Sequence, residues 1–382
     1  MTTGVNTDVG PVRRIERAAV VGSGHMGRGI ALSLLRAGCD VVLFDNAPGR
    51  AADAVTWIAR ELERQAGKGT LSADDAATMS ERLRAAHEID DITDVDLVVE
   101  AIVENLEAKR ALFAQLDGIV RPDTLLATNT STLDVNALAE ATNRRAQVCG
   151  LHFFSPAHVQ KLVEVIDARH TSTHTLDAVL DLVVRMGKTA VVAQVGYGFI
   201  GNRVFDAYVL EALNCALEGA STAQIDAALE NFGFKMGPFR VMDLVGLDIL
   251  WHIRREAGDA EEPGWALLGD VVARGDFGNK TGAGWFAHGE DRSVTERAEI
   301  AELISAAQKA GRVAHVPAES GPLDDHEIVT RCVGALAAEG QRVVADGIAA
   351  SAEDVDTVFV LGYGFPADKG GPMTYGRAAG II

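Results

Sequence analysis

The first half of the chain alternates short apolar runs with longer stretches in which apolar residues recur every three or four positions. The short runs predict buried strands and the longer stretches predict helices. After a first strand that ends at Val21, further strands are expected at 40–45, 95–101, 125–128, 148–154, 162–166 and 190–194. Strands that alternate with helices in this way predict an α/β fold with a mostly parallel, doubly wound sheet.

A glycine turn follows the first predicted strand. Gly22, Gly24 and Gly27 have the spacing G-x-G-x-x-G between that strand and a predicted helix. This spacing allows a tight turn, lets a pyrophosphate approach the backbone, and presents the free N–H groups of a helix N-terminus to the phosphates. The next strand closes with Asp45, near the place of a ribose-binding carboxylate. The stretch predicts a Rossmann-type dinucleotide-binding domain, although an ordinary βαβ turn is the alternative.

A long insertion, residues 47–94, stands where a single crossover helix would suffice. Its two halves, Arg50–Gln65 and Ser72–Ala86, have the pattern of helices. Ser72 followed three residues later by Asp75 has the form of a capping box with Asp in place of Glu. We therefore expect a helical hairpin that projects from the sheet.

The chain after about residue 195 is mainly helical and repeats part of itself. Glu211, Gly219, Ile225-Asp226, Gly233-Phe234 and Gly237-Pro238 are echoed by Glu339, Gly347, Val355-Asp356, Gly364-Phe365 and Gly371-Pro372. The echo predicts two copies of one helical repeat, although chance Gly and Pro punctuation is the alternative. The expected domains are a tail at 1–14, the Rossmann domain at 15–195, an all-α domain at 196–290, a helix and linker at 291–324, and the second copy at 325–382.

Charge and composition limit the partners. The 382 residues include 35 basic and 54 acidic ones, with a formal net charge of −19. This balance argues against nucleic acid or an anionic membrane as the main partner, so an anionic ligand would need a local basic patch. Four cysteines without metal-ligand spacing, each in or beside an apolar segment, predict buried free thiols and no metal site: Cys39, Cys149, Cys215 and Cys332. The sequence has no signal-peptide core and no apolar run near the ~20 residues of a membrane span, which predicts a cytoplasmic protein.

An imidazole and a carboxylate stand inside two of the apolar runs. If these strands pair antiparallel with Phe154 opposite Leu162, then His152 faces Glu164 on one side of the sheet. Each polar group would be costly to bury alone, so mutual pairing is expected. The pair could act as a general base whose imidazolium is stabilised by the acid, or it could be a structural ion pair, and the spacing fits both.

Two further polar groups could converge on this pair. Ser131 follows the end of a strand, on the edge where open α/β sheets bind ligands. Asn202 stands where the sheet domain passes into the helical domain, a common place for a cleft. Either residue could equally be a helix cap.

Taken in order, these motifs resemble the NAD-dependent 3-hydroxyacyl-CoA dehydrogenases. The resemblance covers about Ile15 to Phe286, and the duplicated helical repeat is similar to the dehydrogenase part of multifunctional fatty-acid β-oxidation enzymes. The segments that carry it are Gly22–Ala31, Val99–Ala101 with Glu104 and Lys109, Asn129–Ser131, His152–Ala157, Leu162–Ile166, Gly198–Arg203, Met236–Phe239 and Lys280–Gly282. One departure is Ser155, where many single-domain relatives have Asn.

The resemblance implies an oxidoreductase that interconverts (S)-3-hydroxyacyl-CoA and 3-oxoacyl-CoA with NAD, in fatty-acid β-oxidation or 3-hydroxybutyryl-CoA metabolism. His152 matches the catalytic base and Glu164 its orienting partner, while Ser131 and Asn202 match the residues that hold the reacting oxygen and the imidazole. The hairpin would cover the CoA moiety, with Lys68 as a phosphate contact. The residues implied at the cofactor are Gly22, Gly24, His25, Met26, Gly27, Asp45, Glu104, Lys109 and Asn129.

Two other functions remain open from the sequence. One is an NAD-dependent dehydrogenase of a free 3-hydroxy acid, like the gulonate dehydrogenase and lambda-crystallin relatives, and the other is a nucleotide-binding protein without turnover. The hairpin with Lys68 favours CoA. Relatives with one copy of the helical repeat often dimerise through it, so the resemblance implies either a monomer that pairs its two copies internally or a homodimer.

Overall fold

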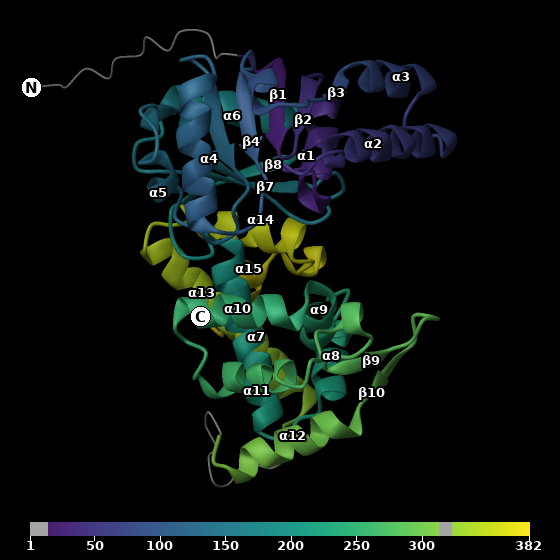
Figure 1. The fold of residues 1–382 in the computed structure, drawn as a ribbon. Coiled ribbons are helices and arrows are strands. Elements are labelled where there is room, and N and C mark those ends of the chain that lie inside the picture. Colours follow the sequence, from purple (N-terminus) through teal and green to yellow (C-terminus); the bar gives the residue numbers. More distant parts are fainter. Residues whose placement is uncertain (1–13, 313–322) are drawn as a thin grey trace, which may run out of the picture. The chain divides into compact units, whose positions relative to one another are not determined.

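A computed structural model describes residues 14–312 and 323–382, and the expected tail and part of the expected linker fall outside these ranges. The chain forms two compact units (Figure 1). The first unit comprises Met1–Asn202 and Asp346–Gly362, and the second comprises Arg203–Ala345 and Tyr363–Ile382. Residues 346–362, expected in the second helical copy, therefore group with the sheet.

An eight-stranded sheet with the order β3-β2-β1-β4-β5-β6-β7-β8 forms the centre of the first unit. Neighbouring strands run parallel except β6 and β7, which are antiparallel. The predicted mostly parallel sheet is thereby confirmed. The strands are β1 (Arg17–Val21), β2 (Asp40–Phe44), β3 (Leu83–Ala85), β4 (Leu97–Glu100), β5 (Leu125–Thr128), β6 (Val148–Phe153), β7 (Leu162–Asp167) and β8 (Thr189–Gln194).

Helices pack on the sheet because alternate strand residues point to opposite faces. Ala18 and Val20 of β1 point into an apolar core that α1 and α6 complete, whereas Phe113 of α4 is buried outside that core. The helices of this unit are α1 (His25–Arg36), α2 (Arg50–Gly67), α3 (Ala73–Glu81), α4 (Leu106–Ile119), α5 (Val135–Ala139), α6 (Thr173–Arg185) and α14 (Ala352–Gly362), with 3-10 turns η1 (Ile89–Ile92) and η2 (Arg145–Gln147).

The predicted hairpin is present as α2 and α3, which extend from the edge of the sheet beside β3 (Figure 1). Ser72 caps α3 by accepting a hydrogen bond of 3.0 Å from the backbone N–H of Asp75. The expected helix over 72–86 ends early, at Glu81. Leu83–Ala85 instead forms the edge strand β3, since Leu83 is buried and pairs with Val41 of β2.

Helix α4 begins at Leu106, six residues after the end of β4. The side chain of Asn105 accepts a hydrogen bond of 2.9 Å from the backbone N–H of Ala108 and so starts the helix there. Residues 101–105 are thereby left as a loop after β4, at the carboxyl edge of the sheet.

The segment from the second copy lies against the far edge of the sheet. The backbone N–H of Gln194 in β8 donates to the carbonyl of Ile348 at 2.9 Å, and Ala193 forms a bridge with Ala349. Gly362 at the end of α14 approaches β7 so closely that a Cβ there would lie 2.9 Å from the side chain of Leu162. This segment therefore covers part of the open edge of β8.

The second unit is mainly helical. Its elements are α7 (Gly201–Leu217, starting in the first unit), α8 (Thr222–Phe232), α9 (Pro238–Val245), α10 (Leu247–Ala257), α11 (Pro263–Val272), α12 (Ala298–Lys309), α13 (Asp325–Ala345) and α15 (Pro372–Ala378), with strands β9 (Phe286–His288) and β10 (Val294–Glu296) and turns η3 (Asn279–Thr281) and η4 (Ala367–Lys369). The prediction of an all-α domain missed the β9–β10 hairpin. Because Val294–Glu296 pairs with β9, the helix expected within 291–324 begins only at Ala298.

Reciprocal ion pairs join α7 and α13, which the sequence assigns to different copies of the predicted repeat, within the second unit. Arg203 of α7 pairs with Glu339 of α13 at 2.7 Å, and Arg331 of α13 pairs with Glu211 of α7 at 2.6 Å. Arg331 follows Arg203 by the same number of residues as Glu339 follows Glu211. A reciprocal pattern of this kind is what a twofold relation between two copies produces.

Candidate active site

The central pair of the site is the imidazole of His152 and the carboxylate of Glu164. The two residues face each other across antiparallel β6 and β7, as the apolar runs predicted. Nδ1 of His152 lies 2.7 Å from Oε2 of Glu164. Glu164 is fully buried and His152 is 7% exposed. The two polar groups therefore satisfy each other inside an apolar part of the sheet.

The second oxygen of Glu164 is held by the backbone at the start of α7. Oε1 accepts hydrogen bonds from the N–H groups of Ile200 at 3.1 Å and Gly201 at 3.0 Å. The turn that aims these groups contains Gly198 with φ 67° and Phe199 with φ 51°. A left-handed conformation is costly for Phe199, so the surrounding packing must hold it.

This arrangement fixes the imidazole of His152. The rings of Phe154 and Phe199 lie 4.8 Å and 5.8 Å from the imidazole centroid. Because an ionised Glu164 only accepts hydrogen bonds, Nδ1 of the neutral imidazole carries the proton and Nε2 keeps a free lone pair. Nε2 is thus the nitrogen available to take up a proton.

A second cluster of polar groups surrounds Glu104, which lies in the loop after β4. Oε1 of Glu104 accepts hydrogen bonds from the hydroxyl of Thr130 at 2.6 Å and from the N–H and hydroxyl of Ser131 at 2.9 Å and 3.2 Å. Burial acts to raise the pKa of Glu104, but the charge of Lys109 and these hydrogen bonds hold it below its usual range. Glu104 therefore stays ionised and positions Ser131.

Lys109 of α4 pairs with the carboxylates at both ends of this segment. Its side chain is 1% exposed, and its ammonium pairs with Glu100 at 2.6 Å and with Glu104 at 3.2 Å. Glu100, at the end of β4, also accepts from the hydroxyl of Thr128 and from the N–H of Ile102, both at 2.7 Å. No role for Glu100 is predicted from the sequence, although a carboxylate at the end of an apolar strand is a signal for one.

Ser131 and Asn202 are brought together. Nδ2 of Asn202 donates to the backbone carbonyl of Ser131 at 3.1 Å. The side chain of Asn129 accepts from the N–H of Phe153, next to His152, at 3.0 Å. The ends of β5 and β6 and the start of α7 are thereby linked, and these polar side chains gather at the carboxyl edge of the sheet, where α/β folds bind ligands.

The glycine turn fits a dinucleotide. Gly22 has φ 99°, and a Cβ there would lie 2.4 Å from the carbonyl oxygen of Ala101, while a Cβ on Gly27 would lie 1.8 Å from the carbonyl oxygen of Gly22. Gly24, which precedes α1, has nothing within 4 Å of an added Cβ. The first two contacts require glycine, and the open side of Gly24 leaves bare backbone for a pyrophosphate.

Asp45 lies at the end of β2, beside this turn. Its Oδ2 accepts from the N–H and hydroxyl of Ser23 at 2.9 Å and 2.6 Å, and Oδ1 accepts from the N–H of Ala47 at 3.0 Å. Partial burial acts to raise the pKa of Asp45, but these hydrogen bonds and the charge of Arg50 hold it below its usual range. A fixed, ionised carboxylate at this place fits a ribose hydroxyl.

His25, Met26 and Lys68 are the remaining residues expected in the site. Nε2 of His25 lies 3.2 Å from the hydroxyl of Ser155, and Met26 is partly buried against the core. Lys68 caps the carboxyl end of α2 and is exposed, and its ammonium has no hydrogen bond or ion pair with another residue in 14–312 or 323–382. The structure therefore does not bring Lys68 into contact with the other expected site residues.

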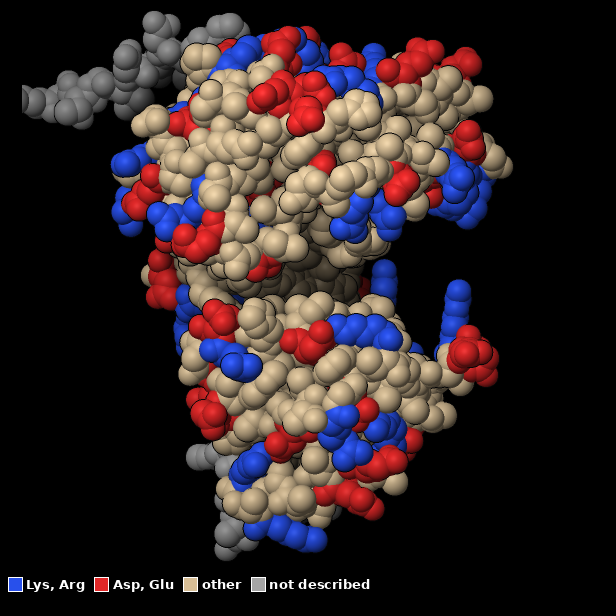
Figure 2. Space-filling model, in the orientation of Figure 1, with Lys and Arg blue, Asp and Glu red and all other residues tan. Residues whose placement is uncertain are grey.

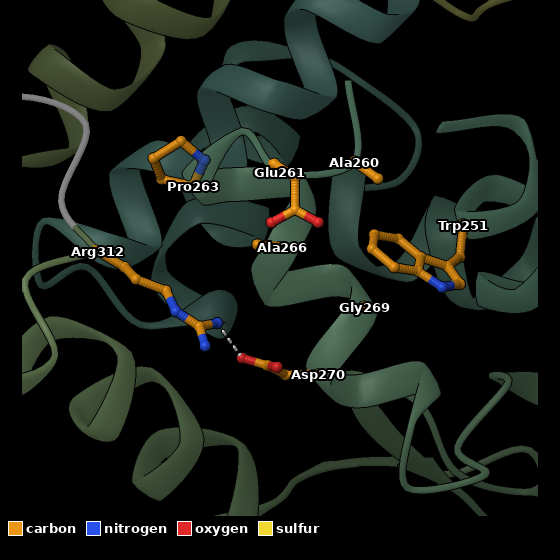
Figure 3. A pocket seen from close by; sticks show the side chains of 8 residues that line it. All are labelled: Trp251, Ala260, Glu261, Pro263, Ala266, Gly269, Asp270 and Arg312. Carbon is orange, nitrogen blue, oxygen red and sulfur yellow. Dashed lines mark hydrogen bonds and ion pairs between the residues drawn. The ribbon is translucent and has the colours of Figure 1, made fainter. Parts of the chain in front are cut away.

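The second unit carries a separate pocket of about 380 Å³. Trp251 forms one of its walls, and Arg312 points toward Asp270 across it in an ion pair of 2.6 Å (Figure 3). None of the residues expected in the site from the sequence lines this pocket.

Comparison with known families agrees with the geometry of the first unit. Residues 17–196 match the family described as 3-hydroxyacyl-CoA dehydrogenase, NAD binding domain, and residues 198–288 match its C-terminal domain. The chain belongs to the 3-hydroxyacyl-CoA dehydrogenase family. It carries the family's NAD-binding domain, so NAD is its cofactor.

Relatives of this dehydrogenase-family chain include larger proteins. A peroxisomal bifunctional enzyme of Danio rerio is 39% identical over 383 residues, which cover 97% of this chain and 52% of the relative. The enzyme of the same name from Homo sapiens is 36% identical over 395 residues, covering 99% of this chain and 54% of the relative. The chain thus spans about half the length of these curated relatives.

Solved structures give the same assignment. A 3-hydroxybutyryl-CoA dehydrogenase from Escherichia coli superposes with a TM-score of 0.81 at 27% identity, covering 96% of this chain and 92% of that one. An (S)-3-hydroxybutyryl-CoA dehydrogenase from Ralstonia eutropha gives a TM-score of 0.69 at 32% identity, covering 72% of this chain and all of its own.

Two expectations about the environment of the chain have different outcomes. All four cysteines lie in the described residues, and each is a buried free thiol, as predicted. The described part of the chain contains no helix long and apolar enough to cross a membrane. A cytoplasmic location is not confirmed, because the relatives' names refer to peroxisomes and, for a protein of Cucumis sativus, to glyoxysomes.

Proposed function

We propose that the chain catalyses the NAD-dependent interconversion of (S)-3-hydroxyacyl-CoA and 3-oxoacyl-CoA. The observation that carries this proposal is the buried 2.7 Å contact between Nδ1 of His152 and Glu164, which leaves Nε2 as a base at the carboxyl edge of the sheet. When bound, NAD accepts the hydride that leaves C3 of the 3-hydroxyacyl substrate.

His152 moves the proton. Nε2 takes the proton of the 3-hydroxyl during oxidation and returns it to the 3-oxo oxygen in the reverse direction. The imidazolium that forms is stabilised by Glu164, which the N–H groups of Ile200 and Gly201 keep in place. The hydroxyl of Ser131 and the amide of Asn202 orient the reacting oxygen, and the hydrogen bond from Nδ2 of Asn202 to the backbone carbonyl of Ser131, which holds the two residues together, supports this role.

The cofactor is held by the glycine turn and the loops beside it. Gly22, Gly24 and Gly27 with the start of α1 bind the diphosphate, and Asp45 binds the adenine ribose. His25 and Met26 flank the diphosphate, while Glu104 and Asn129, with Lys109 acting through Glu104, line the nicotinamide end.

The decisive experiment measures NADH oxidation with acetoacetyl-CoA and, in parallel, with free acetoacetate. The proposal expects turnover of the thioester and little of the free acid. A preference for the free acid would instead identify a dehydrogenase of free 3-hydroxy acids, and no turnover of either substrate would leave only nucleotide binding. A series of 3-oxoacyl-CoA thioesters of increasing length then defines the acyl chain.

The names of the relatives support a place in fatty-acid β-oxidation. The reciprocal ion pairs between α7 and α13 support an internal pairing of the two helical copies. Since that pairing occupies the same kind of surface that a second chain would need, a monomer is the proposed state, and a homodimer is the alternative.

A further inference from the structure

One segment that is distant in the sequence lies close to the His152–Glu164 pair within the first unit. Residues 346–362 contain α14, which packs beside β7 and β8 (Figure 1). The sequence assigns these residues to the second copy of the predicted repeat, and the proposed reaction gives them no role. Two of their contacts nevertheless reach the immediate surroundings of the pair.

The first contact is made by Gly362, at the end of α14. A Cβ added to Gly362 would lie 2.9 Å from Cδ2 of Leu162 and 3.2 Å from Cε1 of Phe154. Leu162 and Glu164 point to the same face of β7, because they are two residues apart. The ring of Phe154 packs on the imidazole of His152, with 4.8 Å between the centroids. Gly362 therefore backs one neighbour of each member of the pair.

The second contact is made by Ile348, near the other end of the segment. A Cβ added to Gly196 would lie 2.4 Å from Cδ1 of Ile348, so this buried side chain fills the space beside Gly196. The carbonyl of Gly196 accepts a hydrogen bond of 3.1 Å from the N–H of Phe199. Ile348 thus supports the turn whose next two N–H groups donate to Oε1 of Glu164.

The backbone of this turn depends on such support. Phe199 is fully buried and has a φ of 51°. A left-handed conformation is costly for a residue with a side chain and persists only where the surrounding packing determines it. Within the described residues, the two N–H groups that follow the turn are the donors to Oε1 of Glu164. A shift of the turn would therefore release one oxygen of this carboxylate.

We infer that residues 346–362 position the His152–Glu164 pair, with Gly362 and Ile348 as the positioning residues. Gly362 acts through the aromatic ring and the strand residue that it backs, and Ile348 acts through the turn before α7. Neither residue supplies a group to the reaction. The inference rests on the proposed function, since the pair is the base of that reaction.

The first test enlarges Gly362. The branched side chain of Gly362→Val would collide with Leu162 and Phe154, so it should displace the pair and lower kcat for acetoacetyl-CoA about 10- to 100-fold. Gly362→Ala adds one carbon and should cause a smaller loss. Kd for NADH should stay within about twofold of the wild type in both variants, because the glycine turn and Asp45 hold the cofactor.

The second test removes the support at the other end. Ile348→Ala leaves the space beside Gly196 empty, and kcat should fall about 10-fold or more. Ile348→Leu keeps an apolar side chain of the same volume and should restore most of the activity. Failure of the leucine variant to exceed the alanine variant would contradict the role given to this side chain.

A matched control must lose stability without touching the pair. Leu182→Ala truncates a fully buried side chain of α6 in the core with Val163 and Val165, on the other face of β7. It should lower the free energy of unfolding at least as much as Ile348→Ala, yet keep kcat within about twofold of the wild type. Charges of both signs are dispersed over the surface in Figure 2, and Glu353→Gln, which removes an exposed one from α14, should change neither quantity.

The pH dependence of kcat/KM gives a readout that lost stability alone does not move. With (S)-3-hydroxybutyryl-CoA as substrate, kcat/KM falls at low pH as the base becomes protonated. A displaced Glu164 stabilises the imidazolium less, so the midpoint of this fall should move to lower pH by about half a unit or more in Gly362→Val and Ile348→Ala. Leu182→Ala should keep the midpoint of the wild type.

Nitrogen NMR of isotope-labelled histidine separates this inference from the proposed function, because it requires no turnover. The signal of His152 is the one missing from His152→Gln. The wild type should carry a proton on Nδ1, and this proton should exchange faster with water in Gly362→Val and Ile348→Ala. A wild type with this NMR behaviour that does not reduce acetoacetyl-CoA overturns the proposed function alone.

Three results would overturn the present inference. The first is an active wild type whose Gly362→Val and Ile348→Ala variants keep its kcat and its pH midpoint. The second is an equal loss of kcat in Leu182→Ala and Ile348→Ala, because lost packing would then explain both. The third is an unchanged His152 signal in both positioning variants, which decides the question even where the wild type shows no turnover.

Discussion

Arg203 of α7 and Glu339 of α13 form an ion pair of 2.7 Å inside the second unit. Arg331 and Glu211 repeat this contact with the two helices exchanged. Both pairs are largely shielded from solvent, so they contribute more than exposed pairs do. We expect the chain to be a monomer in light scattering, and a dimer would contradict the internal pairing.

The Arg203 pair also makes a stability prediction. Arg203→Ala should lower the free energy of unfolding by about 1–3 kcal/mol, because Glu339 loses a partly buried hydrogen-bond donor. The matched control is Arg342→Ala, since Arg342 donates to the same Glu339 but is mostly exposed and should cost less than about 1 kcal/mol. Denaturant unfolding measures both values, and equal losses would contradict the role given to the pair between copies.

Removal of the base should separate chemistry from binding. His152→Gln is expected to lower kcat by about 10²–10⁴. Kd for NADH should not change, because the glycine turn and Asp45 hold the cofactor independently of the imidazole. Steady-state kinetics and NADH fluorescence titration provide the two values. Near-full activity of the variant would exclude His152 as the base.

Glu164→Gln tests how the imidazole is oriented. An amide can donate to Nδ1, which would move the imidazole proton to Nε2 and remove the base, so kcat should fall by about 10³–10⁴. Glu63→Gln, an exposed change on α2, serves as the control. If Glu164→Gln keeps its kcat, the carboxylate is a structural partner of His152 only.

The charge of Asp45 should select the dinucleotide. The carboxylate repels a 2′-phosphate and accepts from a 2′-hydroxyl, so kcat/KM with NADP should be about 100-fold or more below that with NAD. Asp45→Asn keeps an acceptor for Ser23 but removes the charge. The preference for NAD over NADP, measured as the ratio of the two kcat/KM values, should therefore fall about tenfold or more. Equal efficiency of the wild type with both cofactors would contradict this prediction.

Asp226 should make stability depend on pH. Burial raises its pKa from 3.8 to about 7, although the N–H groups of Phe239 and Arg240 donate to it. The folded state therefore binds a proton more tightly than the unfolded state, and stability falls as the pH rises from about 4 to about 7. In Asp226→Asn this contribution, at most about 1.4 kcal/mol per pH unit, should be absent from unfolding curves measured across that range. Parallel pH profiles of the two proteins would contradict it.

The sequence predicted those features that depend on local patterns. Alternating apolar runs were enough to place His152 opposite Glu164, because the register of two strands joined by a short loop is set by their side-chain period. The glycine spacing located the turn before α1, where a Cβ on Gly27 would lie 1.8 Å from the carbonyl oxygen of Gly22.

Features that depend on distant contacts were missed. The strand Leu83–Ala85 has three residues and becomes visible only through its pairing with β2. Glu100 stands at the end of an apolar run, and its role depends on Lys109 reaching back from α4. The contact of Gly362 with Phe154 requires α14 to pack beside β7, which no spacing in the sequence encodes.

The attachment of residues 346–362 to β8 bears on how the protein is made. The nucleotide-binding half is assembled from two stretches separated by more than a hundred residues, so the ribosome has to add all of these residues after Asn202 before that half is complete. A fragment ending at Asn202 would leave the backbone of Gln194 without the acceptor at Ile348, and such an unprotected strand edge invites aggregation.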